Sequence, residues 1–221
     1  MGTQRQQYEQ WFAKRRGPRH IEDERASLEA ADAYDEICRS GKLSQPLVKI
    51  LLNAVESPRA LVWNCGVDLL KKLMKTWPEI ALEILQVQKN SSSTVRFNAM
   101  CCVDDSMPRQ TATEMIEMGL GDKSGRVRWK AAQQAEWLNV SDAIPLLTQA
   151  VEAEKNAKVR ASLQHSLRLL KDGYILDKQV DGTYSLWLRV RDGHSGRSVT
   201  KSELDAKGID TIIREFRDDR A

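Results

Sequence analysis

The side chains best suited to chemistry are few in this chain of 221 residues, and they are widely spaced. It holds four cysteines and three histidines, but no Cys-x-x-Cys pair and no cluster of the two types, which a zinc site requires. The sequence therefore predicts no metal and no other cofactor. Each cysteine lies in a helical segment among apolar or small residues, which favours buried, reduced thiols. These residues are Cys38, Cys65, Cys101 and Cys102, with His20, His165 and His194.

Two polar pairs resemble parts of catalytic sites, but neither has the required surroundings. His194 and Ser195 stand in the glycine-flanked stretch DGHSG, which suits a turn better than a catalytic triad. Asp104 and Asp105 follow a helical stretch, where paired carboxylates are usually solvated or cap the next turn. No nucleophile motif or phosphate-binding loop is present. We therefore expect no catalytic residue and a protein that is not an enzyme.

The composition argues against several classes of protein. Lys and Arg number 34 against 31 Asp and Glu, and a net charge of +3 gives no broad attraction to nucleic acid or to an anionic membrane. The N-terminus lacks the apolar core of a signal peptide, and no apolar run is long enough to span a bilayer. We expect a cytoplasmic globular protein without membrane association.

An internal repeat is the strongest pattern in the chain. Three Val-Arg pairs recur at a spacing of 32 residues, and a Val-Trp pair precedes the first of them by 33. Six positions before each arginine stands a small polar or acidic residue. Apolar residues follow at helical spacing, and a polar turn leads to a second amphipathic stretch, so each unit is predicted to be two helices. The pairs are Val62-Trp63, Val95-Arg96, Val127-Arg128 and Val159-Arg160, and the polar residues are Asn90, Asp122 and Glu154.

This pattern resembles the HEAT repeat, particularly its short bacterial form, which also occurs in phycobilisome lyase subunits. The resemblance covers about residues 57–172 and implies an all-α, right-handed α–α superhelix. It also implies that the repeat arginine bridges to the polar residue of the preceding turn, so that Arg128 pairs with Asp122 and Arg160 with Glu154, with Arg96 as their equivalent. A planar guanidinium suits such a bridge better than an ammonium group does. Alternatively, the arginines form a row that binds an acidic ligand.

The two ends of the chain differ from the repeats, so we predict three parts. Residues 1–24 form a helix over 3–14 followed by a basic linker, and residues 25–173 hold the helical repeats, with a degenerate first pair over 26–55. Residues 174–221 form a small α/β appendage, which either covers the last repeat or recognises a partner.

Within the appendage, local signals predict each element. Asp181-Gly182 separates two stretches of alternating character, which indicates a β-hairpin, and residues 197–200 are expected to form a third strand. Ser202 and Asp205 predict the capped start of a short helix. A final helix over 210–217 is expected to bury three apolar residues: Ile212, Ile213 and Phe216.

A stack of helix pairs presents an extended, largely preformed surface, which favours binding without a large ordering cost. The sequence therefore predicts a non-catalytic scaffold that binds another protein through the second helices of the repeats. The candidate contact residues are the polar side chains on those helices: Lys49, Asn53, Glu83, Glu114, Glu117 and Gln149.

The alternative is a nucleic-acid-binding protein or a DNA repair enzyme. The segment 62–68 is similar to the catalytic helix of HEAT-like bacterial glycosylases that remove alkylated purines, where an aspartate closely follows a tryptophan. In such a site an aromatic face binds the cationic base and a carboxylate stabilises the sugar cation. Here Asp68 lies five residues after Trp63, which turns it away from the tryptophan's helix face. The basic residues of this candidate site are Arg126, Arg128 and Lys130.

Overall fold

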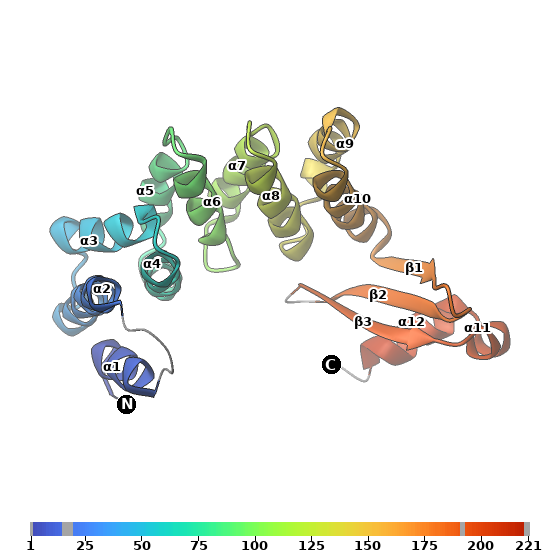
Figure 1. Cartoon of the computed structure of the whole chain (residues 1–221), viewed down its shortest axis with the longest axis horizontal. Helices are drawn as coiled ribbons and strands as arrows, with labels where there is room; N and C mark the ends of the chain where they lie inside the picture. Colours follow the sequence, from blue (N-terminus) through green and yellow to red (C-terminus); the bar gives the residue numbers. More distant parts are fainter. Residues whose placement is uncertain (1, 15–19, 191–192, 219–221) are drawn as a thin grey trace. The chain divides into compact units, whose positions relative to one another are not determined.

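The computed structural model describes residues 2–14, 20–190 and 193–218, which are mostly helical and include a three-stranded antiparallel sheet near the C-terminus (Figure 1). The chain divides into two compact units, residues 1–119 and 120–221. The predicted boundary between residues 173 and 174 falls inside the second unit. Among the described helices, none combines the length and the apolar composition needed to cross a membrane.

The first unit consists of helices, and the predicted helix at 3–14 and the predicted helix pair over 26–55 are confirmed. The predicted linker up to residue 24 is too long, because α2 begins at Ile21; residues 15–19 of that linker lie outside the described residues. These helices are α1 (Gln4–Lys14), α2 (Ile21–Ser40), α3 (Gln45–Glu56), α4 (Ala60–Met74), α5 (Ile80–Val87), α6 (Ser93–Cys101) and α7 (Arg109–Leu120). Helix α2 packs against α1, α3 and α4, and α6 packs against α3, α4 and α5.

Small and polar residues allow these helices to approach closely. A Cβ atom on Gly66 of α4 would lie 2.8 Å from the Val55 nitrogen, so only glycine fits where α4 crosses α3. Asn98 of α6 is fully buried and donates from Nδ2 to the carbonyl oxygens of Val55 (2.8 Å) and Ser57 (3.1 Å). These two carbonyls at the end of α3 have no partner within their own helix, so Asn98 both satisfies them and fixes α6 on α3.

The second unit combines helices with the sheet. Its elements are α8 (Gly125–Trp137), a 3-10 turn η1 (Ser141–Ala143), α9 (Ile144–Ala153), α10 (Ala157–Asp172), β1 (Tyr174–Lys178), β2 (Tyr184–Val190), β3 (Gly193–Val199), α11 (Lys201–Lys207) and α12 (Ile209–Asp218). Helix α10 packs against α8 and α9, and the sheet contacts both α8 and α10.

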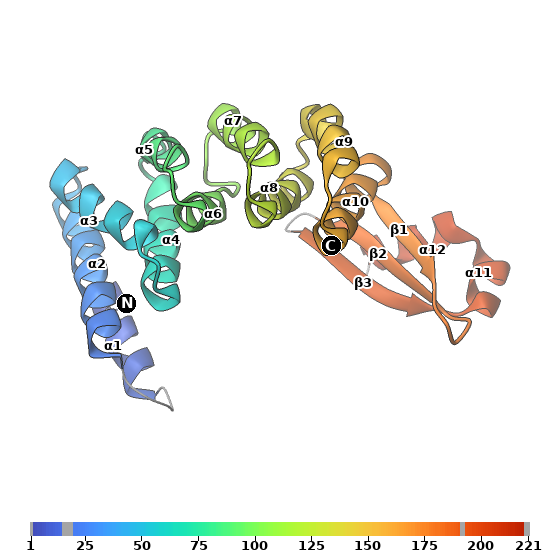
Figure 2. The ribbon, with the colours of Figure 1, turned by 45° about the horizontal axis from the view of Figure 1, so that its top comes forward.

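The sheet has the order β1-β2-β3, and the predicted hairpin around Asp181-Gly182 is confirmed. As predicted, successive side chains of β2 lie on opposite faces of the sheet. Leu186 and Leu188 are fully buried in an apolar cluster with Ile212 and Phe216 of α12, which covers one face of the sheet (Figure 2). The predicted apolar face of the final helix is therefore confirmed.

Two local predictions in this unit are wrong. His194 and its neighbours do not form a turn but belong to β3, where His194 pairs with Arg189, because ladder hydrogen bonding to β2 overrides the local glycine signal; Arg191 and Asp192 lie outside the described residues. The cap of α11 is Thr200, not Ser202, since the Thr200 hydroxyl accepts the Glu203 N–H (3.1 Å).

The polar residue of each repeat closes its turn in the same way. Its side-chain oxygen accepts the backbone N–H two residues later in all three copies, at distances of 2.9, 2.7 and 2.8 Å. The three oxygens belong to Asn90, Asp122 and Glu154, and the three N–H groups to Ser92, Ser124 and Asn156. The polar residue that recurs six positions before each repeat arginine is therefore the hydrogen-bond acceptor that closes the turn.

The repeat arginine also has a shared role in two copies. Nη1 of Arg96 donates to the carbonyl oxygens of residues 90 (2.9 Å) and 91 (2.7 Å), and Nη1 of Arg128 donates to those of residues 122 (2.6 Å) and 123 (3.1 Å). Each arginine therefore ties its helix to the preceding turn, as expected, but it does so through main-chain oxygens.

The predicted pairing of Arg160 with Glu154 is wrong. Glu154 accepts from Nε of Arg128 at 3.0 Å and also contacts its Nη2, whereas Arg160 is exposed. Since α10 packs on α8, the turn before α10 brings Glu154 to the arginine of the preceding repeat. The N–H of Asn156 and the Arg128 guanidinium hold the pKa of Glu154 below its usual value.

We expect Arg128→Lys to lower the free energy of unfolding by about 1–2 kcal/mol, because one ammonium group cannot replace the bonds of the fork to two carbonyls and a carboxylate. Arg160→Lys, at the same repeat position, should change it by less than about 0.5 kcal/mol. Urea unfolding followed by circular dichroism measures both. Equal losses in the two variants would contradict the assigned role of Arg128.

Candidate functional site

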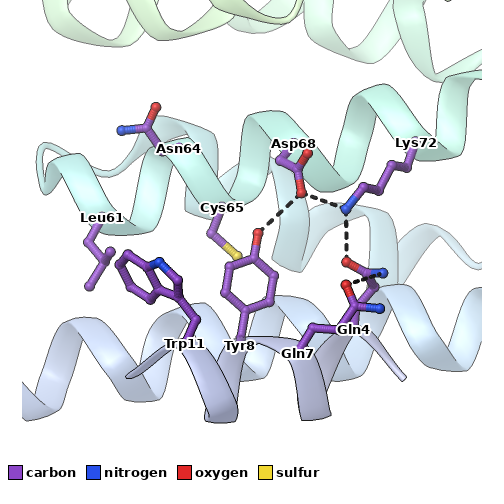
Figure 3. Close-up of a pocket in the computed structure, with 9 residues that line it drawn as sticks. All are labelled: Gln4, Gln7, Tyr8, Trp11, Leu61, Asn64, Cys65, Asp68 and Lys72. Atoms are coloured by element: carbon purple, nitrogen blue, oxygen red, sulfur yellow. Dashed lines mark hydrogen bonds and ion pairs between the residues drawn. The ribbon is translucent and has the colours of Figure 1, made fainter. Parts of the chain in front are cut away.

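An open pocket of about 410 Å³ lies between α1 and α4 in the first unit (Figure 3). Its lining residues recur every three or four positions on each helix, so each helix presents one face to it. They are Gln4, Gln7, Tyr8 and Trp11 from α1, and Leu61, Asn64, Cys65, Asp68 and Lys72 from α4. We refer to this pocket as the α1/α4 groove.

Helix α1 is held in place by a carboxylate from α2. The two oxygens of Asp35 accept the backbone N–H groups of Gln4 (2.9 Å) and Arg5 (3.0 Å), which have no partner inside α1. A negative charge at this end also complements the helix dipole. Phe12, further along α1, is only 4% exposed. Together these contacts fix the wall of the groove that α1 provides.

One end of the groove is polar. Oδ2 of Asp68 accepts from the Tyr8 hydroxyl (3.3 Å) and from Nζ of Lys72 (2.7 Å), which lies one helical turn further along α4. Lys72 also donates to Oε1 of Gln4 (2.9 Å), as Figure 3 shows. Burial, with smaller contributions from Cys65 and Asp68, raises the pKa of Tyr8 far above its usual value, so its hydroxyl stays protonated.

The other end is apolar and open to solvent. The indole of Trp11 lies beside Leu61 in Figure 3, and Trp11 is 47% exposed. Its ring contacts the ring of Phe12 edge-on, with centroids 5.1 Å apart. The exposed indole is therefore supported by a buried aromatic side chain. The groove thus joins an exposed aromatic surface to a hydrogen-bonded ion pair.

Cys65 lies between these two ends. Its thiol donates to the Ser27 carbonyl (3.5 Å), and burial is the main cause that raises its pKa to about 11. A thiol in this state is a poor nucleophile near neutral pH. The expectation of buried thiols holds for Cys65 and Cys102 but is wrong for Cys38, which is exposed; Cys101 is half-buried.

The residues of the predicted nucleic-acid site are divided between the two units. Trp63 packs edge-on against Phe97 of α6 (centroids 6.0 Å apart), whereas Asp68 on the same helix faces α1. Arg126, Arg128 and Lys130 lie on α8 in the second unit. The guanidinium of Arg128 is hydrogen-bonded to the turn before α8. Lys130 donates to Gln133 (2.8 Å), and its ammonium group lies over the ring of Trp137.

The predicted protein-contact residues lie on α3, α5, α7 and α9. Lys49, Asn53, Glu114, Glu117 and Gln149 are exposed, and Glu83 is half-buried. Lys49 forms an ion pair with Glu56 of its own helix at 3.9 Å.

Sequence reasoning missed the α1/α4 groove as a site. It predicted a helix over 3–14 and singled out Asp68, but no local signal shows that α1 packs beside α4. Within the described part of the chain, no group of three or more His, Cys, Asp or Glu residues is arranged to hold a metal ion. Comparisons of the chain with protein families, with curated proteins and with solved structures find no match.

The thiol of Cys65 should resist alkylation. With a pKa of about 11, about one thiol in a thousand is ionised at pH 8, and this fraction grows as the pH rises toward 11. We expect iodoacetamide at pH 8 to modify the exposed Cys38 but not Cys65, as measured by peptide mass spectrometry, and to modify both in urea. Equal labelling of both cysteines in the folded protein would show that α1 does not cover Cys65.

Proposed function

We propose that this protein is a non-catalytic scaffold built from HEAT-like helical repeats, and that it binds a segment of another protein in the α1/α4 groove. The bound segment presents an apolar side chain and, about one helical turn away, a basic side chain. The observation that carries the proposal is the joint exposure of Trp11 and of the Asp68 carboxylate in one groove.

The repeat architecture is supported by the turns. Three turns 32 residues apart are closed by the same hydrogen bond, and two of them are tied to the next helix by the same arginine contact. Such recurrence is typical of proteins in which one supersecondary unit stacks on the next.

The apolar end of the groove fits an aliphatic or aromatic side chain. An exposed tryptophan supported by packed neighbours is a frequent energetic centre of protein interfaces, because it buries a large area with little loss of side-chain freedom. Leu61 extends this apolar surface on the opposite wall. A volume of about 410 Å³ is within the range of ligand pockets and accommodates one or two side chains.

The polar end favours a basic group over a phosphate. The Asp68 side chain is 51% exposed, and among the described residues its Oδ1 accepts no hydrogen bond. Helix α2, which packs on both walls, carries seven acidic and two basic residues. A lysine or arginine of a partner therefore meets a free carboxylate oxygen and a negative surrounding, whereas a nucleic-acid backbone would be repelled.

Peptide display on the full-length protein tests the proposal. We expect it to select sequences in which Leu, Ile or Phe stands three or four positions from Arg or Lys. Leu61→Glu should weaken a selected peptide at least tenfold, and Asp68→Asn should weaken it several-fold, as measured by fluorescence anisotropy. Exchange of the peptide's basic residue for Glu should abolish binding.

Matched variants distinguish the groove from the outer helix faces. Glu114→Lys with Glu117→Lys on α7 changes the predicted contact surface and should leave peptide affinity unchanged. If this double variant abolished binding while Leu61→Glu did not, the outer face would be the binding surface and the groove proposal would be wrong. Salt-dependent affinity for duplex DNA, lost on changing Arg126 and Lys130, would instead favour the nucleic-acid alternative.

A further inference from the structure

A second cavity, of about 370 Å³, lies within the second unit between α8, α10 and the start of β3. Its lining combines aromatic, hydroxyl, imidazole and carboxylate groups that are distant in sequence. The lining residues are Trp129, Gln133 and Glu136 from α8, Ala161, Ser162, His165 and Ser166 from α10, and His194 from β3.

The centre of this cavity is a buried carboxylate bound to an imidazole. Glu136 is 1% exposed, and its two oxygens accept from Nδ1 of His194 (2.9 Å) and from the Ser166 hydroxyl (3.1 Å). Burial raises the pKa of Glu136, and the bonds from His194 and Ser166 oppose this shift. A carboxylate at Nδ1 fixes the ring and leaves Nε2 as the nitrogen that can meet a ligand.

Both imidazoles of the cavity have unused nitrogen atoms. Among the described residues, Nε2 of His194 and both nitrogens of His165 have no hydrogen-bond partner, although the His194 side chain is only 27% exposed. The two rings lie 5.5 Å apart, and the indole of Trp187 contacts each of them edge-on. Burial, and then the charge of His194, lowers the pKa of His165, so His165 remains neutral at pH 7.

The unused imidazole nitrogens, and not a free carboxylate, are the polar groups that the described lining offers to a ligand. The carboxylates are Glu136, whose two oxygens already accept hydrogen bonds, and Asp177 of β1, which is paired with Arg168 of α10 at 2.9 Å. The cations that act on these groups are Arg168, which acts on His165, and Arg189 of β2, which acts on Glu136. Among the described residues these two cations offset the two carboxylates, and both oxygens of Glu136 already accept hydrogen bonds, so an organic cation would gain little here.

We propose that this cavity binds a small aromatic carboxylate, whose anionic group accepts a hydrogen bond from Nε2 of His194 and whose ring lies against Trp129. In the complex, Nδ1 of His194 faces Glu136 and Nε2 faces the ligand, so the ring bridges the two carboxyl groups. Trp129 lines the cavity and is 37% exposed, so its indole offers a face on which a planar ring can stack.

Benzoate is the probe, and benzamide is its neutral control of the same shape. Titration of the full-length protein is followed by the imidazole signals in nuclear magnetic resonance spectra. We expect benzoate to shift the His194 and His165 signals, and calorimetry measures its affinity. Benzamide should bind at least tenfold more weakly than benzoate.

Three variants separate the site from general effects. His194→Gln should weaken benzoate at least tenfold, Trp129→Ala several-fold, and His20→Gln in the first unit should have no effect. Trp129→Ala changes a partly exposed side chain, so it tests the site even if replacement of His194 disturbs folding. Equal affinities for benzoate and benzamide, no shift of the His194 signal, or unchanged binding by His194→Gln and Trp129→Ala would each overturn the proposal.

Discussion

The fold depends on how the main-chain carbonyl oxygens at helix ends are satisfied. A chain of short helices has many helix C-termini, and each of them leaves carbonyl oxygens without a partner inside the helix. In the first unit Asn98 supplies donors to the end of α3, and Arg96 supplies them to the turn before α6. In the second unit Arg128 serves the turn before α8, and Arg189 of β2 donates to the Leu170 carbonyl in α10 (3.2 Å). Each donor therefore also positions the element that carries it.

The elements predicted correctly are those that local patterns determine. Amphipathic spacing predicts the helices over 3–14 and 210–217, and alternation around Asp181-Gly182 predicts the hairpin, because these patterns depend on neighbours within a few residues. Partners across packed elements were not predictable. Glu154 belongs to Arg128 and not to Arg160 because α10 lies on α8, and His194 is in a strand because β2 pairs with it.

Both candidate sites join segments that are far apart in the sequence. In the groove, Tyr8 meets Asp68 across 60 residues, and in the second cavity Glu136 meets His194 across 58. The sequence contains one usable signal for the second cavity, since Glu136 directly follows Ala135 on the buried face of an alanine-rich helix, where an acidic residue needs a partner. Nothing nearby indicates that the partner is a histidine in the C-terminal strands.

Glu136 also has a consequence for shortening the chain. Its carboxylate connects α8 to α10 through Ser166 and to β3 through His194. Deletion of the residues after Gly173 would remove the imidazole and uncover the helix face on which the sheet packs, and leaving a buried acceptor without its hydrogen-bond partner costs about 1–3 kcal/mol. Limited proteolysis within the C-terminal strands is therefore expected to unravel the whole of residues 120–221, not to release a trimmed, stable helical core.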